Sequence, residues 1–229
     1  VFVASAYLAA YNARACGVRD YIAQLMFNSP PGHSDAMDLA KMLAVLELIE
    51  PLQGPDFHIW RQTRTGLLSY PLDPSAARAH LAASVYVQMA LRPHIVHVVG
   101  HTEADHAATA DDVIEACGLA RRAIENALRG APDMTADPAV QARKSRVIAD
   151  TRLILQAIAR LSPHSPDPLT DPVALARAVQ SGILDAPHLR NNPFARGAIR
   201  TRIVSGACVA VDDAGRPLAE ADRLAVLGI

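Results

Sequence analysis

Three successive stretches of the chain each join a short apolar segment to a longer amphipathic one. The short segments are typical of β-strands and cover residues 21–27, 57–64 and 94–99. The longer segments place apolar residues at steps of three and four, which predicts helices over residues 34–49, 74–91 and 109–130. Turn-forming residues such as Asn28-Ser29-Pro30-Pro31 separate the two kinds of segment. Thr109 is placed to cap the third helix.

This order of elements predicts an α/β fold. Three βα units in series favour a parallel sheet, and right-handed crossovers make it either a doubly wound sheet or part of a (β/α)8 barrel. In both architectures ligands bind at the carboxyl ends of the strands. The loops that we expect to carry function are therefore residues 28–33, 61–71 and 100–109.

The pattern changes after the third unit. A charged amphipathic helix is predicted over residues 138–161, and a proline-rich joint follows it. Asp171-Pro172 is typical of a helix start, and two β-type runs and a short terminal helix complete the chain. We therefore expect two parts, βα units in residues 1–161 and an α+β extension in residues 162–229.

Composition narrows the possible classes of function. The 229 residues include 22 Lys and Arg against 23 Asp and Glu, which gives a formal net charge of -1. No basic cluster supplies a nucleic-acid-binding face, and no apolar run reaches the roughly 18 residues of a membrane helix. Cys16, Cys117 and Cys208 are widely spaced and odd in number. We interpret them as reduced, mostly buried thiols of a cytoplasmic protein, with no adjacent base to activate them.

The loop after the third β-type segment is the richest in functional groups. His101, Glu103 and His106 have the spacing H-x-E-x-x-H, which differs from the helical H-E-x-x-H motif of zinc enzymes. One hypothesis is a metal-dependent hydrolase or lyase that uses these three residues. The alternative is that Asp105 and His106 cap or solvate the next helix, while Glu103 accepts hydrogen bonds from two hydroxyl groups, as an acid does from a ribose.

Four other side chains leave two interpretations open or favour packing. Arg61 and Arg64 lie near the end of the second β-type segment, where a guanidinium can clamp a carboxylate or pair with an acid on a neighbouring loop. Tyr70 can lay its ring against a ligand or pack in the core. His97 alternates with apolar residues in its segment, which favours a histidine buried in the core.

Several sets of residues, taken in their order and spacing, resemble one enzyme family. They are Tyr70-Pro71 with the Ala-rich helix after it, residues 94–99 with Glu103-Ala104 beyond them, Gly182-Ile183-Leu184-Asp185-Ala186-Pro187, and Asn192-Pro193-Phe194-Ala195. From Gly17 onward the chain resembles the carboxyl-terminal half of the epsilon (large) subunit of glutamate mutase, also called methylaspartate mutase. The alignment has low identity and runs without gaps from Gly17 to about Glu103.

The resemblance implies a partial (β/α)8 TIM-type barrel, with residues 1–161 as its second half and residues 162–229 as a C-terminal extension. It implies an isomerase that uses adenosylcobalamin to interconvert L-glutamate and 3-methylaspartate by a radical carbon-skeleton rearrangement. The chain corresponds to about half of a family subunit, and residues 1–16 already have a helical pattern. We therefore expect this sequence to be a fragment.

Two of the family's contacts with the adenosyl group fall on residues of matching kind. The aromatic residue before a proline is Tyr70, and the glutamate after a strand is Glu103, so the resemblance assigns both to cofactor binding. A lysine and an aliphatic contact of the family fall on Val99 and Ala107. These two positions depart from the pattern, and the first departure removes an ammonium group.

Two absences shape the expected assembly. The family's substrate-binding arginines and tyrosines precede the position of Val1, so the resemblance names no catalytic residue here. The chain also lacks D-x-H-x-x-G, which supplies a cobalt-binding histidine, because Asp185-Ala186-Pro187-His188 has the wrong spacing. The resemblance thus implies a hetero-oligomer with a separate small, sigma-type cobalamin-binding subunit and an amino-acid substrate. A further hypothesis is a non-catalytic partial barrel that only assembles with that subunit.

Overall fold

The computed structural model describes residues 1–229 and contains a three-stranded sheet, a two-stranded sheet and a set of α-helices. Its first part comprises α1 (Phe2–Ala15), β1 (Asp20–Phe27), α2 (Asp35–Ile49), β2 (His58–Thr65), α3 (Pro74–Gln88), β3 (Ile95–His97) and α4 (Ala110–Leu128). The remainder comprises α5 (Pro138–Arg160), α6 (Pro172–Ser181), β4 (Arg200–Val204), β5 (Ala207–Val211) and α7 (Glu220–Val226). The predicted order of strands and helices is confirmed throughout.

Most of the helices begin at a side chain that accepts a hydrogen bond from the first turn. The capping residues are Ser34, Asp73, Thr109, Asp137 and Asp171. Such caps satisfy backbone N–H groups that have no partner inside the helix. The predicted cap of α4 is confirmed and extends to a capping box, because the Asp112 carboxylate accepts a hydrogen bond from the Thr109 N–H in return.

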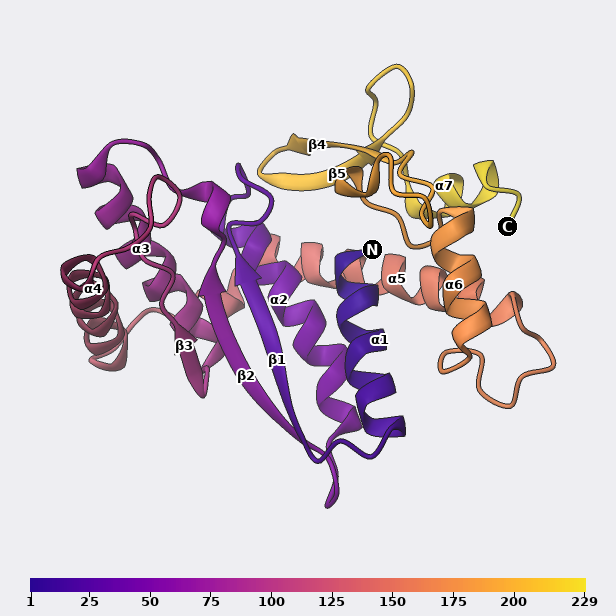
Figure 1. The fold of residues 1–229 in the computed structure, drawn as a ribbon, viewed down its shortest axis with the longest axis horizontal. Coiled ribbons are helices and arrows are strands. Elements are labelled where there is room, and N and C mark those ends of the chain that lie inside the picture. The colour runs from indigo at the N-terminus through magenta and orange to yellow at the C-terminus, as the bar shows by residue number, and fades with distance from the viewer.

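The three strands of the first part form a parallel sheet in their order along the chain. β1 pairs with β2 over its whole length, whereas β3 pairs with β2 only over Ile95–His97. In Figure 1 the strands lie side by side, with α3 and α4 beyond β3 and with α2 and α1 beyond β1. The carboxyl ends of all three strands therefore meet at one edge of the sheet, as predicted.

Only one face of this sheet is covered. On the covered face, Leu25 and Phe27 are 0% and 1% exposed and belong to a cluster that includes the apolar residues of α2. On the other face, Ile22, Trp60 and Ile95 are 51%, 37% and 37% exposed. Successive residues of a strand point to opposite faces, so the buried and exposed sets follow directly from the strand period. The expected parallel α/β sheet is confirmed, and its three strands do not form a closed barrel.

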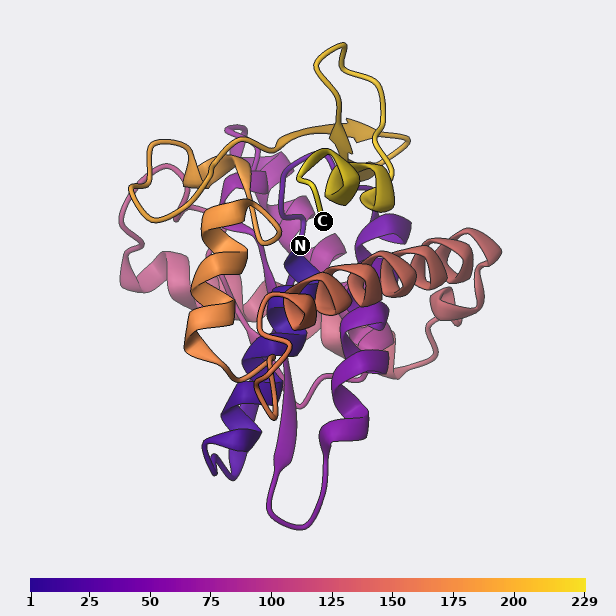
Figure 2. The same ribbon diagram turned by 90° about the vertical axis from the view of Figure 1, so that its right-hand side faces the viewer.

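The C-terminal part packs directly against the βα units. α1, α5, α6 and α7 share a second buried cluster that consists of Ala4, Leu8, Ile154, Ala157, Ile158, Ala178, Ile183 and Leu224. Figure 2 shows α5 running across α1 and α2, and Figure 1 shows the antiparallel β4–β5 hairpin near the carboxyl ends of the strands. Residues on both sides of residue 161 therefore contribute to one core.

Two expectations about individual side chains are wrong. Cys16 and Cys117 are exposed, and Cys208 is only half-buried. The expectation that the three thiols are mostly buried is therefore wrong. His97 is exposed because it lies on the uncovered face of the sheet, not on the face that packs against helices.

No helix in the structure combines the length and apolarity needed to cross a membrane.

Gly66 allows the end of β2 to approach the end of β1, and we expect Gly66→Ala to destabilise the fold. A Cβ atom there would lie 3.0 Å from the carbonyl oxygens of both Phe27 and Asn28. We expect the free energy of unfolding to fall by about 1–3 kcal/mol, measured by urea denaturation.

Gly118→Ala in α4 is the matched control, because a Cβ atom at Gly118 meets nothing within 4 Å. This helical substitution should raise the free energy of unfolding by about 0.5–1 kcal/mol. Equal stability of Gly66→Ala and wild type would contradict the close packing of these two strand ends.

Candidate functional site

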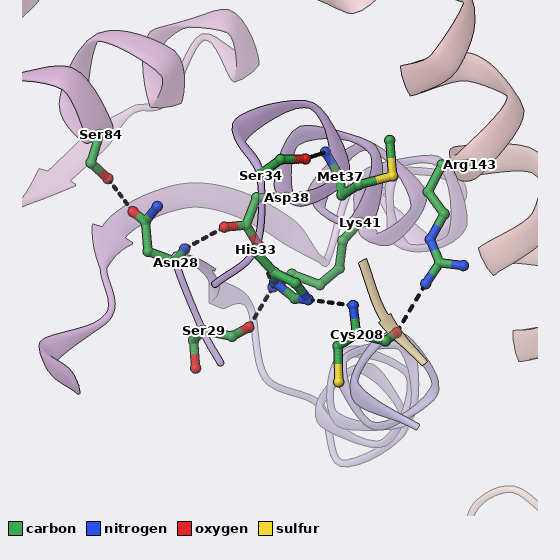
Figure 3. A network of polar contacts seen from close by, with 10 residues as sticks. All are labelled: Asn28, Ser29, His33, Ser34, Met37, Asp38, Lys41, Ser84, Arg143 and Cys208. Atoms are coloured by element: carbon green, nitrogen blue, oxygen red, sulfur yellow. Dashed lines mark hydrogen bonds and ion pairs between the residues drawn. The ribbon is translucent and has the colours of Figure 1, made fainter. Parts of the chain in front are cut away.

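Polar side chains gather at the carboxyl ends of β1, β2 and β3, where the predicted loops lie. The group at β1 is drawn in Figure 3 and centres on Asp38 in the first turns of α2. The group at β2 and β3 centres on the peptide bond between Val99 and Gly100. A chain of buried hydrogen bonds runs from the first group across the end of β2. We therefore treat this edge of the sheet as the candidate functional site.

Asp38 is a fully buried carboxylate with three donors. Oδ2 accepts a hydrogen bond from the Asn28 N–H at 2.5 Å, and Oδ1 lies 2.9 Å from His33 Nδ1 and 2.6 Å from Lys41 Nζ. Burial acts to raise the pKa of Asp38, but the contacts with His33 and Lys41 outweigh it and hold the pKa below its usual range. Asp38 therefore carries a negative charge inside the protein, and that charge fixes the loop after β1.

Lys41 connects the same loop to α2. Its ammonium group donates a hydrogen bond to the Ser29 carbonyl oxygen at 2.7 Å as well as pairing with Asp38. Burial lowers the pKa of Lys41 in spite of the adjacent carboxylate. Asp38 and Lys41 of α2 thus hold the loop after β1 at Asn28, Ser29 and His33. A simple turn does not need this many side-chain contacts.

His33 joins this loop to the C-terminal hairpin. Its Nε2 accepts a hydrogen bond from the Cys208 backbone N–H at 3.0 Å, and Arg143 of α5 donates to the Cys208 carbonyl oxygen at 3.2 Å. Because Nε2 is the acceptor, Nδ1 carries the hydrogen that faces Asp38. Figure 3 shows His33 between Asp38 and Cys208. Two distant parts of the chain are therefore joined directly at the end of β1.

The expectation that no base lies near a cysteine is wrong for Cys208. Burial acts to raise the pKa of the Cys208 thiol. Contacts with His33 and Thr201 and the charge of Lys41 outweigh this effect, so the pKa lies below its ordinary value. Only the fold brings His33 and Cys208 together, because 175 positions separate them in the sequence. No motif in the sequence signals this pair.

A buried polar chain extends from Asn28 to the end of β2. The Ser84 hydroxyl donates to Asn28 Oδ1 at 2.6 Å, and the Thr65 hydroxyl donates to Ser84 Oγ at 2.9 Å. Gln88 Nε2 donates to both of these hydroxyl oxygens at 3.0 Å. Asn28 itself has a φ of 56°, in the left-handed region where Asn is among the most tolerant residues other than glycine. Residues of β2 and α3 thus support the loop after β1.

Tyr70 and Glu103 bind the two polar ends of one peptide unit. The Tyr70 hydroxyl donates to the Val99 carbonyl oxygen at 2.7 Å, and Glu103 Oε1 accepts from the Gly100 N–H at 2.5 Å. The Tyr70 side chain is buried, whereas Glu103 is exposed. Burial and the nearby Glu103 carboxylate raise the pKa of Tyr70 to about 12, while Thr65 and Arg64 act in the opposite direction. The two residues that the resemblance assigned to cofactor binding therefore contact the same peptide unit.

The two histidines of the third loop, His101 and His106, contact different acidic residues. His101 is buried and lies 3.5 Å from Glu115 of α4, which also binds Arg78 of α3. His106 is exposed and contacts Asp105 and Asp112 beside the start of α4. Thr109 and Asp112 cap this helix, so Asp105 and His106 are solvated groups and not caps. No group of three or more His, Cys, Asp or Glu side chains is placed to hold a metal ion. The geometry therefore gives no support to the metal hypothesis.

Arg61 and Arg64 face opposite sides of β2 because three positions separate them. Arg61 points to the helices, where it donates to the Leu91 carbonyl oxygen at 2.9 Å and lies 3.8 Å from Glu50. This is the ion pair that one interpretation predicted. Arg64 points to the uncovered face, and its Nε atom is buried without a hydrogen-bond partner. Only Arg64 is therefore placed to meet a ligand at the edge of the sheet.

Neither a comparison with protein-family models nor a search of curated proteins finds a match for this chain. The resemblance to glutamate mutase therefore stays a hypothesis.

We expect Asp38→Asn to destabilise the protein strongly, because Lys41 would keep a buried charge without its partner. The free energy of unfolding should fall by about 3–5 kcal/mol. Asp35→Asn is the control, since Asp35 is exposed in the first turn of α2, and it should cost less than about 1 kcal/mol. Urea denaturation of the three proteins at pH 6 tests this prediction.

The same comparison has a predicted pH dependence. The folded pKa of Asp38 lies below its ordinary value of 3.8, so the stabilisation is fully present above pH 3.8 and is lost as the pH falls through the folded value. The difference in unfolding free energy between wild type and Asp38→Asn should therefore narrow below pH 3.8. A difference that stays constant down to acid unfolding would show that Asp38 is not a charged partner of Lys41.

Proposed function

We propose that this chain is part of the large subunit of an adenosylcobalamin-dependent carbon-skeleton mutase that interconverts L-glutamate and 3-methylaspartate. The observation that carries the proposal is the Val99–Gly100 peptide, held by Tyr70 on one side and Glu103 on the other. It lies just beyond β3, at the edge of the sheet where parallel α/β proteins bind their ligands. The exposed carboxylate of Glu103 is thereby held at the mouth of the proposed site.

One-sided coverage of the sheet supports a partial barrel. In a doubly wound fold, helices cover both faces of a parallel sheet, whereas in a barrel they cover only the outside. Here the strands follow one another in chain order, and the helices pack on one face. Ile22, Trp60 and Ile95 on the uncovered face would then line the inside of a barrel completed by further βα units. Parallel strands are normally buried on both faces, which further βα units would achieve.

The residues present fit the adenosyl group at one position. Glu103 uses Oε1 for the Gly100 N–H, while no hydrogen bond within the chain uses Oε2. A carboxylate oxygen of this kind accepts hydrogen bonds from ribose hydroxyls. Gly100 allows this approach, because a Cβ atom there would lie 3.0 Å from Glu103 Oε1. We therefore assign ribose binding to Glu103.

Tyr70 has a supporting role in this proposal. Its side chain is only 7% exposed, packs edge-on against His80 and uses its hydroxyl for Val99. The ring therefore holds the peptide from which the Glu103 loop starts. Val99 is 2% exposed, so a buried apolar side chain stands where the family has a lysine. The ribose contact of Glu103 thus lacks the family's neighbouring ammonium group.

When bound, adenosylcobalamin would supply the radical chemistry of the rearrangement. The residues of this chain would position its adenosyl group and exclude water from the mouth of the barrel. The cobalt would be held by a separate small subunit, since the chain has no D-x-H-x-x-G motif. Contacts with the amino-acid substrate would come from the rest of the large subunit.

The test is isotope exchange between substrate and cofactor. The full-length large subunit, its small partner subunit and adenosylcobalamin should transfer tritium from labelled glutamate to the cofactor. We expect Glu103→Gln in this assembly to weaken the apparent affinity for adenosylcobalamin by about 5- to 30-fold, because it removes a charge-assisted hydrogen bond.

Asp105→Asn is the matched control, because Asp105 is an exposed acid of the same loop that contacts only His106. This variant should exchange tritium like the wild type. No exchange by the wild-type assembly would refute the proposed activity. Equal affinities of Glu103→Gln and wild type would refute the role of Glu103 alone.

A further inference from the structure

Arg64 is the penultimate residue of β2 and lies on the uncovered face of the sheet. Its strand neighbours Thr63 and Thr65 are 0% and 1% exposed on the opposite face, which fixes the direction of its side chain. Across the sheet, Arg64 is the register partner of Met26 in β1 and of His97 in β3. Arg64 and His97 therefore project side by side from the carboxyl end of the sheet.

The guanidinium of Arg64 has no partner within the protein. No carboxylate lies within 4.0 Å of its nitrogen atoms, in contrast to Arg61 on the other face. Its Nε atom is buried and forms no hydrogen bond. A buried donor without a partner costs free energy, and a guanidinium carries its donors in a planar fork. The unused fork is suited to an acceptor that the chain itself does not provide.

Other polar side chains lie near Arg64 in the sheet. The negative charge of Glu103 raises the pKa of Tyr70, and the positive charge of Arg64 lowers it. Toward the amino ends of the strands, Gln24 and Gln62 are register partners on the same face, and their amides supply neutral polar contacts.

We propose that Arg64 and His97 bind the carboxylate of a small organic acid on the uncovered face of the sheet. Arg64 would donate two parallel hydrogen bonds from its terminal Nη1 and Nη2 groups to the two oxygens of the carboxylate, and His97 would donate a third from its ring. Gln24 and Gln62 would contact polar groups further along the same molecule. This subsite is separate from the proposed ribose contact of Glu103 and requires no cobalamin.

The test uses the 229-residue chain and sodium propionate as the probe. Nuclear magnetic resonance should show the guanidinium N–H signals of Arg64 shifting on titration with propionate, at constant ionic strength maintained with sodium chloride. Arg64→Gln should weaken propionate binding by about tenfold or more, and Arg64→Lys should weaken it less, because it keeps the charge but loses the planar fork. His97→Ala should weaken binding by about two- to fivefold.

Arg61→Gln is the matched control, because it removes the same kind of side chain from the covered face of the same strand. It should change the affinity for propionate by less than about twofold, since Arg61 is bound to Leu91 and Glu50. Arg64→Lys keeps the test decisive even if Arg64→Gln fails to fold. Absence of a shift in wild type, equal binding by Arg64→Lys, or tighter binding of inorganic phosphate than of propionate would each overturn the inference.

Discussion

The buried charge of Asp38 is the constraint on which the candidate site depends. A carboxylate removed from water is tolerable only when donors surround it, and Asp38 has the Asn28 N–H, His33 and Lys41. Those three donors belong to the loop after β1 and to α2, so satisfying one charge fixes the path of the whole loop. Lys41 and His33 then extend the same arrangement to Ser29 and to the C-terminal hairpin.

The hydrogen bonds that follow from this constraint make the edge of the sheet a single connected unit. Asn28 connects Asp38 to Ser84 of α3, and Ser84 connects to Thr65 at the end of β2. Tyr70 and Glu103 hold the backbone beyond β3 in the same region. Apolar packing between helices and strands surrounds these polar groups and keeps water from competing for them. A site built in this way is positioned before any ligand arrives.

Local signals in the sequence predicted most of the fold. The apolar periods, the turn residues and Thr109 as a cap all act within one or two turns of chain, so the helix starts and strand positions followed from them. The orientation of Arg61 and Arg64 to opposite faces was also available from the strand period. The solvent exposure of His97 could not be predicted, because the sequence does not show that one face of the sheet stays uncovered.

Such local signals could not predict the contacts that form the site. His33 meets Cys208 across 175 positions, and Tyr70 meets Val99 across 29, and neither pair has a local pattern that would announce it. Asp38 was equally hidden, because an aspartate in the first turn of a helix is normally a solvated group that favours the helix dipole. Its complete burial is decided by the loop and the lysine around it.

The grip on the Val99–Gly100 peptide has a consequence for how this region can adapt. Loops often accommodate a ligand by a crankshaft rotation, in which one peptide plane turns over while its neighbours stay in place. Here such a rotation would turn the Val99 carbonyl away from Tyr70 and the Gly100 N–H away from Glu103 together. This loop must therefore adapt to different molecules by changes in the rotamers of its exposed side chains, while the main chain at Val99 and Gly100 keeps its conformation.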